Sequence, residues 1–203
     1  FLVEDDSSQS IPIRAHNTIL FVGRIVPEKG LTYLIRALSS VRKEWRLLVA
    51  GDGEERSYCE SLAEELGVSG QIRFLGWVDE HELARLYDDS SFVVVPSLWP
   101  EPFGRVGPEA ATRGRAAVAF DTGGVSDWLV DGVSGYLVPP GDLGLLSERV
   151  NSLLDSHAQQ VEMGQQARVL AFAKWNSIDH VNHLITHLSA AHIEDARHLV
   201  GGY

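Results

Sequence analysis

Short apolar segments alternate with segments of helical pattern along most of this 203-residue chain. The apolar segments are bounded by glycine, proline or polar residues, which is typical of strands buried on both faces. The predicted strands cover residues 18–22, 46–50, 71–75, 92–95, 116–120 and 136–138. Because strands separated by helices pair in parallel through right-handed crossovers, the pattern predicts an α/β, Rossmann-like parallel sheet with helices on both faces.

Local signals place helices between these strands. Helices are predicted at residues 31–43, 54–66, 80–88 and 143–154, with a helical segment from 157 onward that breaks near residue 175. Asp79 and Asp142 are predicted N-cap residues, and Gly67 is a predicted C-cap. The run Gly51-Asp52-Gly53 lacks the third glycine of a dinucleotide-binding fingerprint and is interpreted as a turn.

The composition fits one globular domain, with 44% hydrophobic and 22% charged residues. Residues 1–17 include a polar run, which indicates a linker or mobile N-terminal segment. We expect a Rossmann-like domain over residues 18–156, completed by C-terminal helices over residues 157–203.

The chain is strongly acidic, with 17 Lys and Arg against 28 Asp and Glu and a net charge of −11. This balance argues against nucleic acid or an anionic membrane surface as a general partner. The single cysteine, Cys59, excludes an internal disulfide. The sequence has no run of about eighteen apolar residues, the length that a transmembrane helix needs. We therefore expect a cytoplasmic protein. Because the chain begins with Phe1 rather than Met, we also expect a fragment or a processed chain.

A proline-rich loop follows the strand at 92–95 and leads into a helix predicted to begin near Gly104. Prolines on both sides hold Glu101 at the carboxyl end of the strand. If the helix begins there, the free N–H groups of Phe103, Gly104 and Arg105 form an anion site that the helix dipole strengthens.

Glu109 lies one turn into this helix, so two carboxylates flank the predicted anion site. Carboxylates accept hydrogen bonds from hydroxyls while backbone amides hold phosphate, and a nucleotide-sugar carries both groups. The alternative is that Glu101 is a solvated loop residue and that Glu109 pairs with Arg105 at i,i+4.

The loop at residues 23–30 contributes two cations, Arg24 and Lys29, at the carboxyl end of the first strand. In an open parallel sheet, ligands bind outside the carboxyl ends of the strands. Both side chains are therefore candidates for a diphosphate clamp. The alternative is that they are charges on a solvated loop.

Together these motifs resemble the retaining GT-B glycosyltransferases of family 4. Glu101 and Glu109 are separated by seven residues, as in the E-x7-E motif of that family, and the glycine-rich run at 23–30 is similar to its phosphate-binding loop. The similarity extends from about Ile19 to Leu154. The resemblance implies the donor-binding half of a GT-B fold, which moves a sugar from a nucleotide diphosphate to an acceptor with retention.

The resemblance also assigns roles to the residues of the phosphate-binding loop and the proline-rich loop. It implies that Arg24 and Lys29, with Gly23 in the same loop, hold the diphosphate. Backbone amides from Phe103 to Val106, including Gly104 and Arg105, would add to this clamp or meet the sugar. Glu101, as the catalytic residue, would bind sugar hydroxyls near the reacting carbon.

Two further assignments concern the nucleoside. Glu109 would bind the ribose hydroxyls. The segment ending at Val78 resembles the family segment whose backbone meets the nucleobase. Trp77, beside it, could stack on a base, but we favour an interpretation in which it covers the core.

The expected activity is that of a hexosyltransferase-type glycosyltransferase whose substrate is a nucleotide-sugar and which needs no cofactor or metal. We expect the acceptor half to be missing, so a second domain or a partner chain must supply it, and self-association near Trp175 is a hypothesis. His180, His183 and His187 share one predicted helix face, which would suit a metal site. Because no carboxylate or cysteine completes a ligand set, we favour surface histidines.

Two other functions compete with this interpretation. A nicotinamide-dependent oxidoreductase needs a glycine fingerprint after its first strand, which Gly23-Arg24-Ile25 does not supply. A non-catalytic nucleotide-binding or protein-interaction module with a Rossmann-like fold is the stronger alternative, because a fold alone does not confer function.

Overall fold

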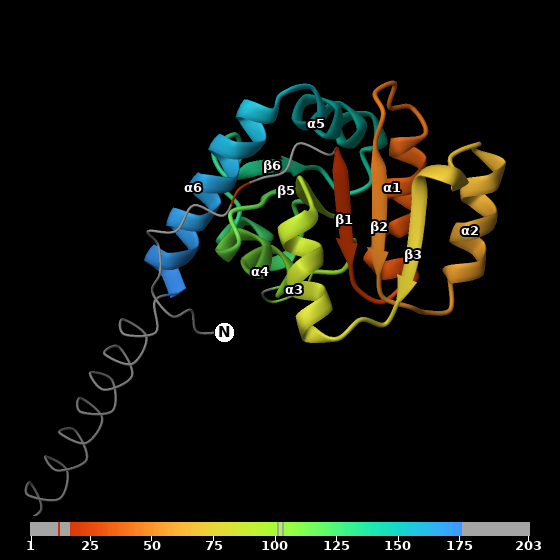
Figure 1. Cartoon of the computed structure of the whole chain (residues 1–203), viewed down its shortest axis with the longest axis horizontal. Coiled ribbons are helices and arrows are strands. Elements are labelled where there is room, and N and C mark those ends of the chain that lie inside the picture. The colour runs from red at the N-terminus through yellow and green to blue at the C-terminus, as the bar shows by residue number, and fades with distance from the viewer. Residues whose placement is uncertain (1–11, 13–16, 101, 103, 176–203) are drawn as a thin grey trace, which may run out of the picture.

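The computed structural model describes residues 12, 17–100, 102 and 104–175 (Figure 1). These residues form a six-stranded sheet in the order β3-β2-β1-β4-β5-β6, and every pairing is parallel. The strands are β1 (Thr18–Val22), β2 (Arg46–Ala50), β3 (Ile72–Gly76), β4 (Phe92–Val95), β5 (Ala116–Phe120) and β6 (Gly135–Val138).

Helices cover both faces of the sheet (Figure 1). They are α1 (Leu31–Leu38), α2 (Arg56–Glu65), α3 (Glu80–Asp89), α4 (Val106–Thr112), α5 (Leu143–Asp155) and α6 (His157–Trp175). Short 3-10 helices occur at Pro27–Lys29, Ser69–Gln71 and Gly123–Asp127. Side chains of α1, α2 and α5 pack on one face, and those of α3 and α4 pack on the other. The predicted fold class is confirmed.

Strand β1 shows why the apolar runs are continuous rather than alternating. Ile19 and Phe21 pack into the cluster under α1 and α5, whereas Leu20 between them packs into the cluster under α3. Successive side chains of a strand point to opposite faces, and helices cover both faces here. Every residue of the strand core therefore has to be apolar, which is the pattern that made the strands predictable.

The first predicted helix is the one whose end differs most from its sequence pattern. The helix expected over residues 31–43 ends at Leu38. The Ser39 hydroxyl donates to the Arg36 carbonyl at 2.8 Å, and the Ser40 N–H donates to the Ala37 carbonyl at 3.2 Å. Serine hydroxyls compete with the helical ladder in this way. The Ser39 hydroxyl therefore helps to end α1 early, and the chain turns back toward β2.

The two predicted N-caps are confirmed. Asp79 Oδ1 accepts the N–H of Glu82 at 2.8 Å, and Asp142 Oδ1 accepts the N–H of Leu145 at 2.9 Å. The C-cap of α2 is Leu66 rather than the predicted Gly67. Gly67 comes next with a φ of +72°, a left-handed conformation that glycine adopts at little cost.

The last described helix, α6, packs on α4 through the alanine cluster Ala111, Ala167 and Ala171. The division between residues 18–156 and 157–203 stays a prediction. His180, His183, His187 and the side chain of Trp175 lie outside the described residues. Across residues 17–100 and 104–175, no helix is long and apolar enough to cross a membrane, and no group of three or more His, Cys, Asp or Glu is placed to hold a metal ion.

Cys59 on α2 should be chemically inert in the folded protein. Its side chain is fully buried, and burial, with the nearby charges of Glu55 and Glu60, raises the thiol pKa to about 12. The reactive thiolate is therefore almost absent at pH 8. We expect a disulfide reagent to label the thiol only when denaturant unfolds the chain. Rapid labelling of the native protein at pH 8 would show that α2 opens locally.

Candidate functional site

The carboxyl ends of β1 and β4 meet at the centre of the sheet. The chain runs outward from β1 to β2 and β3, then returns to the other side of β1 and continues from β4 to β5 and β6. Open α/β sheets bind their ligands outside the strand ends at such a switch of direction. Two loops emerge here, the β1 loop (residues 23–30) and the β4 loop (residues 96–105).

Hydrogen bonds and close packing join these two loops. The Leu98 N–H donates to the Glu28 carbonyl at 2.8 Å, and the Ser97 hydroxyl donates to the same carbonyl at 3.2 Å. Gly30 lies so close to the β4 loop that a Cβ atom at this residue would be 2.0 Å from the Pro96 carbonyl oxygen. The cations of the β1 loop are therefore held beside the segment that leads to α4.

The β1 loop is also anchored to the turn that follows β2. The Gly23 N–H donates to the Ala50 carbonyl at 3.0 Å, and the Ile25 N–H donates to the Asp52 carbonyl at 2.9 Å. A Cβ atom at Gly51 would be only 1.9 Å from the Gly23 carbonyl oxygen. The glycines after β2 thus serve loop-to-loop packing, which agrees with the interpretation of residues 51–53 as a turn.

Both predicted cations lie in this anchored loop. Arg24 is exposed and makes no hydrogen bond or ion pair with the residues that the structure describes. Lys29 is half-buried, and its Cδ atom would be 3.9 Å from a Cβ atom at Gly23, so the lysine stem passes beside that glycine. The β1 loop therefore offers two positive charges at the switch point of the sheet.

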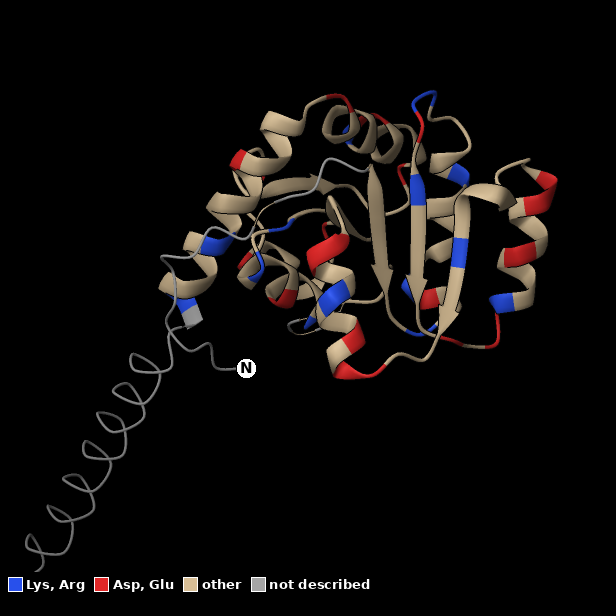
Figure 2. Cartoon of the chain, viewed as in Figure 1, with Lys and Arg blue, Asp and Glu red and all other residues tan. Residues whose placement is uncertain are grey.

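Carboxylates lie near the same loop. Burial and the charges of Glu54 and Glu28 raise the pKa of Glu55 above its ordinary value. Figure 2 shows acidic and basic residues interspersed over the elements in this view. A phosphate at the β1 loop therefore has to gain its affinity from direct contacts with cations and backbone N–H groups, because the surrounding field is not uniformly attractive.

The helix predicted to begin near Gly104 begins two residues later, at Val106. Arg105 is its N-cap residue, and Gly104 before it has a φ of +68°. Glu101 and Phe103 lie outside the described residues. The anion site predicted from the amides of this segment therefore stays a prediction, as does the role of Glu101.

Glu109 on α4 is held from two sides. Its Oε1 accepts a hydrogen bond from Arg105 Nη2 at 2.8 Å, and its Oε2 accepts one from the Tyr87 hydroxyl at 3.2 Å. The Arg105 side chain is 78% exposed, whereas that of Glu109 is 19% exposed. The i,i+4 ion pair between Arg105 and Glu109, one of the alternatives from the sequence, is therefore present. Tyr87 is a second partner of Glu109 that the sequence did not reveal.

Tyr87 is a permanent hydrogen-bond donor to this carboxylate. The residue is only 2% exposed, and burial together with the charge of Glu109 raises the pKa of its hydroxyl. The phenol therefore stays protonated at physiological pH. Tyr87 and Glu109 border a hollow of about 590 Å³ between α3 and α4.

The prediction that Trp77 covers the core is wrong, because its side chain is 74% exposed. The side chain of Val78, the next residue, packs instead against the apolar cluster under α3. Gly76 ends β3 with a φ of +72°, and the left-handed turn changes which of the next side chains faces inward. The alternative, that Trp77 stacks on a base, stays a prediction, as does the contact between the backbone at Val78 and a base.

Sequence reasoning missed two residues that shape the site. Thr122 Oγ1 donates to the Ser97 carbonyl at 3.0 Å and so ties the loop after β5 to the β4 loop. Tyr87 lies 22 residues before its partner Glu109. A tyrosine on the core face of an amphipathic helix indicates that its hydroxyl needs a partner, but the sequence does not identify that partner.

Comparison with known proteins gives one family. The family model described as "Glycosyl transferases group 1" matches residues 3–170. An uncharacterized glycosyltransferase of Methanocaldococcus jannaschii is 35% identical over 164 residues, which is 79% of this chain and 42% of the relative. A D-inositol 3-phosphate glycosyltransferase of Corynebacterium efficiens is 34% identical over 77% of this chain and 39% of the relative. The chain thus spans about two fifths of the length of these curated relatives.

Solved structures share the fold. Anabaena HepE in complex with UDP-glucose is 26% identical and superimposes with a TM-score of 0.79, covering 86% of this chain and 49% of HepE. The six-stranded parallel sheet with helices on both faces matches the architecture of GT-B glycosyltransferases.

Proposed function

The chain belongs to the glycosyl transferases group 1 family, and from this premise we propose that it is the donor-binding domain of a hexosyltransferase-type enzyme. In this proposal, the domain binds a nucleotide-diphosphate sugar, and the enzyme transfers the sugar to an acceptor with retention. The observation that supports it most is the β1 loop, which carries two cations and is packed against the β4 loop at the switch point of the sheet.

Arg24 and Lys29 are the proposed diphosphate clamp. In the transfer, the bond between the anomeric carbon and the diphosphate oxygen breaks, and the bonding electrons leave with the diphosphate. The acceptor oxygen bonds to the same carbon, and its proton passes to the departing diphosphate. Cations placed where this negative charge develops stabilise the transition state more than the ground state. Because these two side chains can neutralise the charge on the diphosphate, we propose that the enzyme needs no resident cofactor or metal.

Glu109 is the proposed ribose ligand, because a carboxylate can accept hydrogen bonds from two neighbouring hydroxyls. The backbone at Val78 is proposed to meet the base, and the amides around Gly104 to add to the diphosphate clamp. Glu101 is proposed to bind the transferred sugar, an assignment that rests on the E-x7-E spacing alone.

Acceptor recognition is proposed to lie in a second domain or a partner chain. The support is that this chain covers about two fifths of its curated relatives. We therefore expect donor binding by the 203-residue chain, and sugar transfer only when the acceptor half is supplied.

Thermal unfolding with added nucleotides tests the proposal. We expect UDP, the nucleotide moiety of the UDP-glucose bound to HepE, to raise the Tm, because a ligand that binds only the folded state stabilises it by about 2.7 kcal/mol at a hundredfold excess over Kd. ADP and GDP extend the panel to other bases, and NAD is the control for an oxidoreductase. A shift with NAD alone would contradict the proposal, and no shift with any nucleotide would favour a protein-interaction module.

A further inference from the structure

The two carboxylate oxygens of Glu109 have partners that differ in their exposure to solvent. Oε1 is paired with Arg105, whose side chain is 78% exposed, so solvent competes for this contact and weakens it. Oε2 is paired with the hydroxyl of Tyr87, which is 2% exposed. Only the first contact can exchange readily with a ligand.

The backbone of Tyr87 is itself held by hydrogen bonds. Its carbonyl accepts one from Nε of Arg115 at 2.8 Å and one from the Ser90 hydroxyl at 2.9 Å. Arg115 is 1% exposed and lies just before β5, so it ties the end of α3 to the sheet. The phenol therefore presents its hydroxyl to α4 from a rigid support.

We propose that Tyr87 is a positioning residue for Glu109. Its hydroxyl holds Oε2 in place, so that Oε1 is the oxygen that exchanges Arg105 for a ribose hydroxyl. The inference rests on the proposed function, because ribose is the group assigned to Glu109 there.

The phenol is suited to this role. A tyrosine hydroxyl has one proton, and the other acceptor near it, the Val106 carbonyl, is farther away at 3.5 Å than the carboxylate at 3.2 Å. A charged acceptor also makes the stronger hydrogen bond. The proton therefore goes to Glu109 and orients its carboxylate before a ligand arrives.

Calorimetric titration with UDP and with 2′,3′-dideoxy-UDP isolates the ribose contribution. The ratio of the two Kd values cancels contacts to the base and diphosphate. For the wild type we expect UDP to bind about tenfold more tightly than the dideoxy analogue, from hydroxyl bonds to a carboxylate. Tyr87→Phe should lose most of this preference, whereas Arg105→Ala should keep it, although both remove one hydrogen bond to Glu109.

Two further variants separate positioning from a loss of stability. Tyr136→Phe is the matched control, because it also removes the hydroxyl of a buried tyrosine. That hydroxyl accepts a hydrogen bond from Gln159 Nε2 at 2.7 Å and lies at β6, the edge strand away from the site. This variant should keep the wild-type ratio. In a Glu109→Ala background, Tyr87→Phe should have no further effect on the ratio, since the carboxylate that it positions is gone. Circular dichroism checks that each variant is folded.

The outcomes distinguish the inference from the function on which it rests. If the wild type prefers UDP and Tyr87→Phe keeps the full preference, the positioning role is wrong and the proposed function stands. The same holds if Tyr136→Phe loses the preference equally. If the wild type binds both nucleotides equally, the ribose assignment of Glu109 is wrong, and the inference is overturned with it.

Discussion

Replacing Lys29 or Arg24 by alanine is expected to weaken binding of UDP and of UDP-glucose alike, by roughly 1.5–3 kcal/mol for each residue. The diphosphate is common to both ligands, and each substitution removes a charged hydrogen bond to it. Both side chains lie in a loop whose backbone is fixed by the neighbouring loops, so alanine at either residue should leave the fold unchanged. Calorimetric titration at two salt concentrations measures the effect, and salt should weaken the wild type more than the variants.

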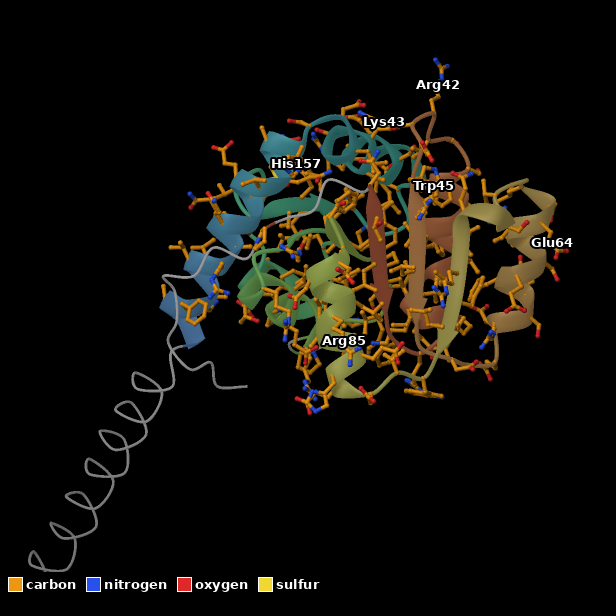
Figure 3. The ribbon with its side chains drawn as sticks, in the orientation of Figure 1. Arg42, Lys43, Trp45, Glu64, Arg85 and His157 are labelled. Carbon is orange, nitrogen blue, oxygen red and sulfur yellow. The ribbon has the colours of Figure 1, made fainter. Side chains whose placement is uncertain are left out.

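Arg42→Ala is the matched control for removal of a positive charge. Figure 3 shows Arg42 extending away from the fold, on the loop between α1 and β2. This loop lies at the amino ends of the parallel strands, whereas the β1 loop lies at their carboxyl ends. Removal of the Arg42 side chain should leave both affinities unchanged. Glu101→Ala is the contrasting variant, because the proposed sugar contact predicts weaker UDP-glucose binding with normal UDP binding. If both β1-loop variants bind like the wild type, these cations are solvated charges and not a clamp.

The sheet could be predicted because its strands are buried on both faces. Residues such as Ile19 and Leu20 face opposite clusters, so the requirement for apolar side chains is continuous along β1 and easy to recognise. The helix ends were less predictable. The residues after Leu38 fit a helical pattern, but α1 ends at Leu38. The Ser39 hydroxyl bonds to the Arg36 carbonyl and so competes with the backbone hydrogen bonds that would extend the helix.

The candidate site was predictable where a single loop carries it. Arg24 and Lys29 are five residues apart and share one turn after one strand, so local reasoning places them together. The pairing of Tyr87 with Glu109 joins two helices that lie on the same face of the sheet, and only the folded chain reveals it. The error at Trp77 has the same origin, because the left-handed turn at Gly76 decides which neighbour is buried.

Gly30→Ala is expected to have the largest effect on stability, because this glycine lies where the β1 and β4 loops touch. Its φ of +67° costs a residue with a side chain about 1–2 kcal/mol. A Cβ atom would also lie 2.0 Å from the carbonyl oxygen of Pro96, a backbone atom that cannot rotate away. Overpacking of this kind costs roughly 1–3 kcal/mol, so the free energy of unfolding should fall by about 2–5 kcal/mol in total.

Gly67→Ala separates the two contributions. Gly67 has nearly the same conformation, with a φ of +72°, but a Cβ atom there would meet nothing within 4 Å. Urea unfolding should therefore show only the backbone cost of about 1–2 kcal/mol for this variant. Since relief of the clash at Gly30 requires the β4 loop to move, Gly30→Ala should also weaken UDP binding, whereas Gly67→Ala should not. Equal losses of stability in both variants, with UDP binding intact, would mean that the two loops separate freely and that their packing does not position the site.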